Sequence, residues 1–164
     1  MEKQQEVNES AAKRKIAECL NRFVNAGDIN NTLLSIIKMF SHYMAFDSVG
    51  LIDDKEKLHQ LRVRDSVFVD LSELFLSLSG AQKVDVNSKP CQLLFALVRD
   101  AGGIDKIINE LTNAYTCCNI TDFGDTKESP VSYAFKSVHS LFVDMLILET
   151  KFPNRYKKFN LIET

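Results

Sequence analysis

Apolar residues recur along this chain at spacings of three and four, the period that places side chains on one face of an α-helix. Residues 1–10 are polar and predict a frayed start. A first helix then ends at Gly27-Asp28, and a second helix is capped by Asn30 or Asn31. We expect these two helices to pair as a hairpin. Their apolar stripes are Ala12, Ile16, Cys19, Leu20, Phe23 and Val24 in the first, and Leu33, Ile36, Ile37, Phe40, Tyr43 and Met44 in the second.

A polar stretch over 47–60 separates this pair of helices from the rest of the chain. It predicts either a loop or a short exposed helix. Beyond it, a third helix is expected to be capped by Asp65 or Ser66 and to end at Gly80. The apolar stripe of this third helix is Val67, Phe68, Leu71, Leu74, Phe75 and Leu78.

Gly102-Gly103 is the sharpest break in the pattern. Pro90 suits the first residue of a fourth helix, because its missing N–H would be unpaired there, and this helix runs to the two glycines. Adjacent glycines take positive φ without a steric penalty, so a buried helix can stop and the next can start in a new direction. A fifth helix follows, and the region through Ile120 is its continuation or a separate turn. Its stripe is Ile104, Ile107, Ile108, Leu111 and Tyr115.

The last predicted helix covers residues 131–151, after a polar loop over 122–130. Val143 and Ile147 lie off its apolar stripe, so the second half of this helix is apolar around most of its circumference. Such a helix must be covered on several sides. We therefore expect it to be the central element of the fold.

No segment alternates with a period of two for long enough to demand a strand, so the fold class is all-α, a compact multi-helix domain. We place the predicted hairpin and polar connector in residues 1–60, packed on a helical domain with a basic tail in residues 61–164. With 164 residues and 45% hydrophobic content the chain can bury a core without metal or disulfide. The four cysteines lie in apolar stretches and predict reduced thiols of a cytosolic or nuclear protein. They are Cys19, Cys91, Cys117 and Cys118.

Charge and hydropathy narrow the possible partners. No apolar segment follows a basic start, so a secretory signal is not expected. The longest candidate for a membrane span, Leu141 to Leu148, falls well short of about 18 residues and predicts no membrane partner. The net charge of −2 does not by itself predict a polyanionic partner.

Catalytic or metal chemistry has little support in the pattern. His42, His59 and His139 lie in three different elements, without a carboxylate or cysteine at a spacing that would orient a ligand or a base. Asp122-Phe123-Gly124 matches the kinase magnesium loop in three letters, but the other kinase motifs are absent. We predict a protein that is not an enzyme, with no cofactor, metal or small-molecule substrate.

The motifs from residue 64 onward suggest a family. The third helix carries Phe68, Leu71, Leu74 and Phe75, Ser88-Lys89-Pro90 leads into the run that ends at the double glycine, and Ile107 follows. The last helix carries Phe135, His139, Leu146 and Glu149. In this order residues 64–152 resemble the AT-rich interaction domain (ARID) family, a helical DNA-binding fold of chromatin proteins. The chain departs from the family in having no tryptophan after the glycines.

In that family the loop before the long helix and the start of that helix enter the major groove of DNA. The resemblance therefore implies contacts from residues 124–137 and from the basic tail. Against this, residues 65–149 hold six Lys and Arg but twelve Asp and Glu, a net charge of −6. The DNA-binding residues that the resemblance implies are Thr126, Lys127, Ser129, Ser132, Lys136, Lys151, Arg155, Lys157 and Lys158.

Two functions follow, both of an ARID-like module in a nuclear, chromatin-associated protein. In the first, the module binds duplex DNA weakly and without much base selectivity. In the second, its partners are subunits of a chromatin complex. The predicted hairpin bears on the second function, because it is apolar on more than one side and needs another surface to cover it, either the protein's own core or a partner. Its apolar residues include Ile36, Ile37, Met39, Phe40, Tyr43, Met44 and Phe46.

An alternative outside chromatin is a Bcl-2-like helical bundle that binds a partner helix in a groove. The resemblance rests on the run from Leu97 to Gly103, where a helix of that family ends. That family continues with a strongly apolar central helix, whereas residues 104–115 here carry several polar side chains.

Overall fold

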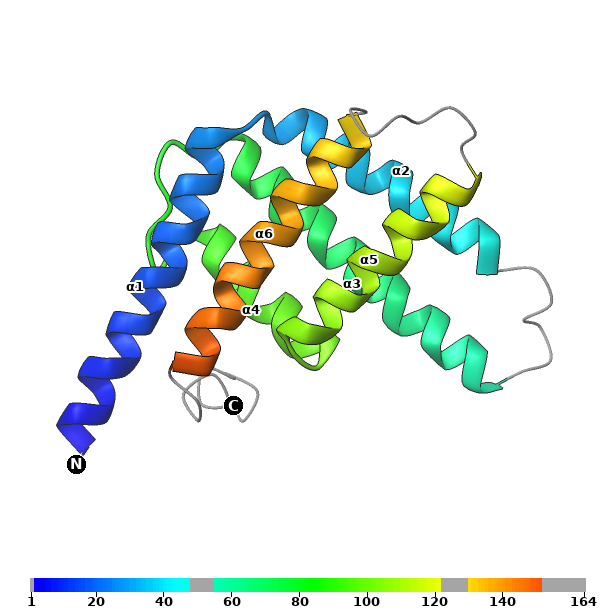
Figure 1. The fold of residues 1–164 in the computed structure, drawn as a ribbon. Helices are drawn as coiled ribbons and strands as arrows, with labels where there is room; N and C mark the ends of the chain where they lie inside the picture. Colours follow the sequence, from blue (N-terminus) through cyan, green and yellow to red (C-terminus); the bar gives the residue numbers. More distant parts are fainter. Residues whose placement is uncertain (1, 48–54, 122–129, 152–164) are drawn as a thin grey trace.

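Six α-helices make up the part of the chain that the computed structural model describes, residues 2–47, 55–121 and 130–151, and no strand occurs in those ranges (Figure 1). The predicted all-α class is confirmed. The helices are α1 (Glu2–Ala26), α2 (Ile29–Asp47), α3 (Lys55–Ser79), α4 (Lys89–Ala101), α5 (Ile104–Thr121) and α6 (Pro130–Lys151).

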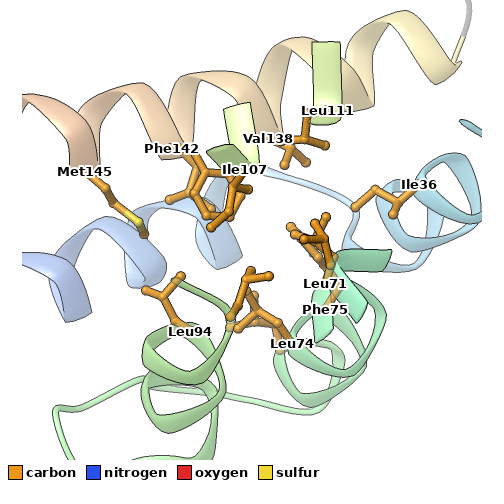
Figure 2. Packing of buried hydrophobic residues seen from close by; sticks show 14 of the residues in the cluster. Ile36, Leu71, Leu74, Phe75, Leu94, Ile107, Leu111, Val138, Phe142 and Met145 are labelled. Atoms are coloured by element: carbon orange, nitrogen blue, oxygen red, sulfur yellow. The ribbon is translucent and has the colours of Figure 1, made fainter. Parts of the chain in front are cut away.

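One hydrophobic core joins the helices. Figure 2 shows side chains from α2 to α6 pointing into a common interior, among them Ile36, Phe75, Leu94, Ile107 and Phe142. Each of these five is almost fully buried, as the stripes at three-and-four spacing require. Around this core, α3 packs on α2 and α4, α2 also packs on α5 and α6, and α6 packs on α1, α2 and α5.

The expected pairing of the first two helices as a hairpin is wrong. α1 lies along α6, whereas α2 packs on α3, α5 and α6 (Figure 1). Phe23 of α1 also meets Phe75 of α3 edge to face, with ring centroids 5.4 Å apart. Most of each predicted stripe is buried or partly buried, although Ile37 of the α2 stripe is exposed and Met39, outside that stripe, is fully buried. A stripe needs only an apolar surface and does not specify which helix provides it.

The predicted helix starts also need correction. α1 begins at Glu2 rather than after a frayed segment, and α3 begins at Lys55, ten residues before the expected caps. The cap of α2 is Asp28, whose Oδ1 accepts a hydrogen bond from the backbone N–H of Asn31 at 3.2 Å, not Asn30 or Asn31. Polar residues can continue a helix beyond its buried stripe, because the backbone hydrogen bonds do not depend on burial. Residues 48–54 of the expected connector lie outside the described residues.

The glycine corner is confirmed. Gly102 has φ 86°, and its N–H donates to the carbonyl oxygens of Val98 and Arg99. Gly103 has φ 138°, and its N–H also donates to Val98 O, at 3.0 Å. These bonds satisfy the last carbonyls of α4. Pro90 lies in the first turn of α4, as expected.

The connector between α3 and α4 is fixed by a side chain that the sequence pattern does not single out. Asn21 of α1 accepts a hydrogen bond from Val84 N at 2.7 Å and donates another to Val84 O. Val84 itself is buried in the core. The connector between α3 and α4, which has no helical stripe, is thus held against α1 through the backbone N–H and C=O of Val84.

α6 has the expected bounds, but it is not enclosed. Three helices cover it, yet Tyr133 and Ile147 are well exposed on its outer face. By length and composition alone, its residues 130–148 could cross a membrane. The sequence analysis considered only the shorter run from Leu141 to Leu148 and predicted no membrane span. Length and composition are weak support for a membrane span, since core helices of helical bundles have the same composition and α6 packs as one of them.

α5 is amphipathic. It buries Ile104, Ile107, Leu111, Ala114 and Cys118 and exposes the polar residues between them. The helix after the glycine corner is therefore not the strongly apolar central helix that the Bcl-2-like alternative implies.

Candidate functional site

Two of the nine predicted DNA-binding residues have described side chains. Ser132 and Lys136 both lie in the first half of α6. Lys151 is the last residue of α6, and its side chain is not described. The other six lie outside the described residues: Thr126, Lys127, Ser129, Arg155, Lys157 and Lys158.

Ser132 is not on the surface. It is 2% exposed, and its Oγ accepts a hydrogen bond from the Tyr115 hydroxyl at 3.3 Å. The Tyr115 ring stacks on Phe135 with centroids 4.1 Å apart, and Phe135 in turn contacts His139. Ser132 therefore belongs to the packing between α5 and α6, and its side chain is not accessible in the structure as it stands. Lys136, by contrast, is exposed.

A buried arginine is the main polar contact that the sequence analysis missed. Arg64 of α3 is 8% exposed, and its Nε lies 3.2 Å from Glu110 Oε2 of α5. Its Cζ lies 3.5 Å from the centroid of the Tyr43 ring, on α2. The signal in the sequence is its spacing, because Arg64 lies three and seven residues before the buried Val67 and Leu71. This arrangement joins three helices through one buried side chain.

A second polar cluster lies between α3 and the end of α4. Burial raises the pKa of Asp70 to about 6, and a hydrogen bond to Asp100 and the negative charge of Asp100 act in the same direction. Asp70 Oδ2 is buried without a hydrogen-bond partner in the part of the chain that the structure describes. Asp100 also pairs with Arg99 at 3.1 Å. Two carboxyls and one guanidinium are too few for a metal site, and no group of three potential ligands occurs among the described residues.

A polar pocket of about 260 Å³ lies between α1 and α6. Lys15 and Arg22 line it together with Glu18 and Asp144, so cations and carboxylates offset each other. The Arg22 Nη2 donates to Cys19 Sγ at 3.2 Å. Such balanced charge does not favour either an anionic or a cationic ligand. The four cysteines are not joined in disulfides, and burial raises the pKa of the Cys91 thiol.

An apolar groove of about 380 Å³ lies between α2 and α3, and we call it the α2–α3 groove. Its lining residues are Leu33, Ile37, Phe68, Val69, Ser72, Glu73 and Leu76. Several of these side chains are open to solvent, with Ile37 38%, Val69 44% and Leu76 64% exposed. Leu34, next to Leu33 on α2, is 63% exposed. This concentration differs from the isolated apolar side chains that occur on most protein surfaces.

The α2–α3 groove has few polar groups. Ser72 Oγ already donates to the Phe68 carbonyl oxygen at 2.8 Å, so it does not need an external partner. Glu73 is the single charged side chain in the lining. The chemistry that this surface supports is burial of apolar groups from another molecule, with one carboxylate at the edge.

The sequence analysis predicted part of the α2 wall of this groove. Ile37 was among the apolar side chains of α2 expected to need another surface, whereas Ile36, Met39 and Phe40 from the same set are buried within the domain. Val69 and Leu76 were missed because they lie off the buried stripe of α3. Only the packing of α2 on α3 brings the two sets together.

The chain matches no protein-family model and no characterised protein, and its structure matches no solved structure.

Proposed function

We propose that this chain is a non-enzymatic protein-interaction module and that the α2–α3 groove is its binding surface. One observation carries the proposal. Of six large apolar side chains that are well exposed in the described part of the chain, four lie on α2 and α3: three line this groove, and Leu34 is next to the lining residue Leu33. The four are Leu34, Ile37, Val69 and Leu76.

The exposed apolar area is large enough to contribute to binding. A leucine fully removed from water contributes about 1.5–3 kcal/mol, so Leu34 and Leu76, each roughly two thirds exposed, retain roughly 1–2 kcal/mol apiece. Part of this gain is lost to the entropy cost of association. A few such side chains in one groove suit a reversible interaction with a second protein.

Site-specific photo-crosslinking in cells tests the proposal. A benzophenone amino acid at position 34 or 76 should form a covalent adduct with another protein. The same group at Tyr133 or Ile147, exposed on α6, provides the control. We expect adducts at the groove positions and their loss when Val69→Glu places a second carboxylate in the lining.

Equal adducts at all four positions would contradict the proposal, as would none at 34 and 76. Because positions 34 and 76 are mostly exposed, the probe should not perturb folding. Circular dichroism and the unfolding midpoint of each variant verify this point.

We further propose the setting that the ARID resemblance implies, a chromatin-associated assembly in the nucleus. The glycine corner on which that resemblance depends has the left-handed geometry expected from the sequence. The crosslinked partner identifies the setting, since a subunit of a chromatin complex would support it and a partner from another compartment would contradict it.

Weak binding of duplex DNA is the second candidate function, and the observation that favours it is the exposure of Lys136. This lysine lies in the second turn of α6, where the resemblance places a DNA contact. Duplex binding commonly uses roughly 6–10 phosphate contacts, more than this acidic module supplies easily.

Anisotropy of a labelled duplex, titrated at several salt concentrations, tests this second function. Lys136→Glu should weaken binding and lower the salt slope by about one, whereas Lys106→Glu makes the same charge change on the first turn of α5 and should have little effect. No association at about 50 mM salt would end this candidate.

A further inference from the structure

The walls of the α2–α3 groove limit which backbone conformation can occupy it. Both walls are helices, whose backbone N–H and C=O groups are paired within the helix. The Ser72 hydroxyl is also paired, with Phe68 O. An extended segment laid over this lining would find no partners for its own backbone groups, and each unpaired group costs free energy. A helix satisfies its own backbone and can present side chains alone.

The length of the groove limits how many side chains can enter. Its α3 wall runs from Phe68 to Leu76, which is about 12 Å at 1.5 Å per helical residue, or roughly two turns. A helix lying in the α2–α3 groove therefore presents apolar residues at i, i+4 and i+7, the spacing that keeps them on one face.

Charge adds a condition on the partner. Glu73 is exposed and makes no ion pair with any residue in the described part of the chain. No lysine or arginine is among the lining residues. A partner with a Lys or Arg beside its apolar stripe would pair with this carboxylate, whereas one with Asp or Glu there would be repelled.

A second copy of this chain fits the groove poorly. Two grooves placed face to face are both concave, and they bring the two Glu73 carboxylates into one interface. The outer face of α6 offers Tyr133 and Ile147, but these are 14 residues or about 21 Å apart. The exposed residues between them are polar, so α6 provides no apolar ridge of two turns.

Resting on the proposed function, we infer that the occupant of the α2–α3 groove is an amphipathic helix of another protein, with apolar residues at i, i+4 and i+7 and a lysine or arginine placed to meet Glu73.

Fluorescence anisotropy with designed helical peptides tests this inference on the full chain. The first peptide is alanine-based, about 16 residues long, with leucines at i, i+4 and i+7 and a lysine beside them. The second carries glutamate in place of that lysine. The third has the composition of the first, with its leucines distributed around the helix. We expect saturable binding of the first peptide and at least tenfold weaker binding of the third.

The charge pair is tested by exchange. Glu73→Lys should weaken binding of the lysine peptide about two- to fivefold and strengthen binding of the glutamate peptide by a similar factor, as expected for a partly exposed pair. Asp144→Lys makes the same charge change on α6, in the polar pocket between α1 and α6 and outside the groove lining, and should leave the ratio between the two peptides unchanged. Leu76→Glu should abolish binding of both, and an unaltered unfolding midpoint shows that it still folds.

The outcomes separate this inference from the proposed function. If the first and third peptides bind equally while crosslinks form at positions 34 and 76, the groove binds protein but its occupant is not a one-sided helix. If Glu73→Lys leaves the relative affinities of the lysine and glutamate peptides unchanged, the requirement for a basic partner is wrong. A concentration-dependent dimer that Leu76→Glu dissociates would make the occupant a second copy. Failure of both the peptides and the groove crosslinks would overturn the proposed function as well.

Discussion

Burial changes the acid–base chemistry of the Asp70 side chain. Burial raises its pKa to about 6, the hydrogen bond to Asp100 and the charges of Asp100 and Glu73 act in the same direction, and Arg99 opposes them. The folded state therefore binds this proton more tightly than the unfolded state, whose pKa is near 3.8. The stabilisation is complete below about pH 4 and is lost as the pH rises toward 6.

We predict that Asp70→Asn makes the protein more stable than the wild type at pH 7 and that the difference disappears near pH 4. The asparagine amide can donate to Asp100, as the protonated carboxyl does, and it carries no charge at any pH. Because Asp70 is only partly buried, solvent screening reduces the expected difference to about 1 kcal/mol. Urea unfolding of both proteins between pH 4 and 8 measures it.

Asp65→Asn removes an exposed carboxylate from the same helix and controls for the loss of charge alone. A difference between Asp70→Asn and wild type that stays constant from pH 4 to 8 would show that Asp70 does not titrate differently in the two states.

At the scale of elements, the sequence pattern predicted the helices and the glycine corner better than the contacts between them. The stripes of α3 and α5 and the bounds of α6 follow from three-and-four spacing, and the corner follows from Gly102-Gly103. The starts of α1 and α3 were placed about ten residues late, because helices extend through polar segments that contain no stripe. The cap at Asp28 was missed because Asn30 and Asn31 are equally good capping residue types.

The corner gives a prediction at this scale. Gly102 has positive φ, and a Cβ added there would meet nothing within 4 Å, so the cost of Gly102→Ala is conformational strain alone. We expect a loss of about 1–2 kcal/mol in the free energy of unfolding. Gly80→Ala is the matched control, since Gly80 also has space for a Cβ but no positive φ, and its effect should stay within about 0.5 kcal/mol.

Thermal and urea unfolding of the two variants provide the comparison. Equal midpoints for Gly102→Ala and Gly80→Ala would mean that the corner tolerates a side chain and that its left-handed geometry is not required.

At the scale of the whole molecule, one buried ion pair links helices that are far apart in sequence. Arg64 on α3 pairs with Glu110 on α5 and lies over Tyr43 on α2. Removing one partner of a buried ion pair leaves the other charge buried and uncompensated. The loss therefore lowers the stability of the whole junction between these helices.

We predict that Arg64→Ala lowers the free energy of unfolding by about 3 kcal/mol, because the half-buried Glu110 loses its partner. The double variant Arg64→Met with Glu110→Leu should recover most of this loss, since neither charge remains. Arg99→Ala breaks a partly exposed pair and should cost less than about 1 kcal/mol. Urea midpoints at unchanged m-values report the three effects. A double variant no more stable than Arg64→Ala would show that the pair itself is not what stabilises this junction.

The division between sequence and tertiary structure follows from the range of the interactions. Helical periodicity, the glycine corner and the all-α class depend on residues within a few positions of each other, and these were visible in the sequence alone. The α2–α3 groove combines Ile37 with Val69 and Leu76, and the buried pair combines Arg64 with Glu110. An apolar stripe does not specify its partner, so only the packed structure decided that α1 lies along α6 and that these distant side chains meet.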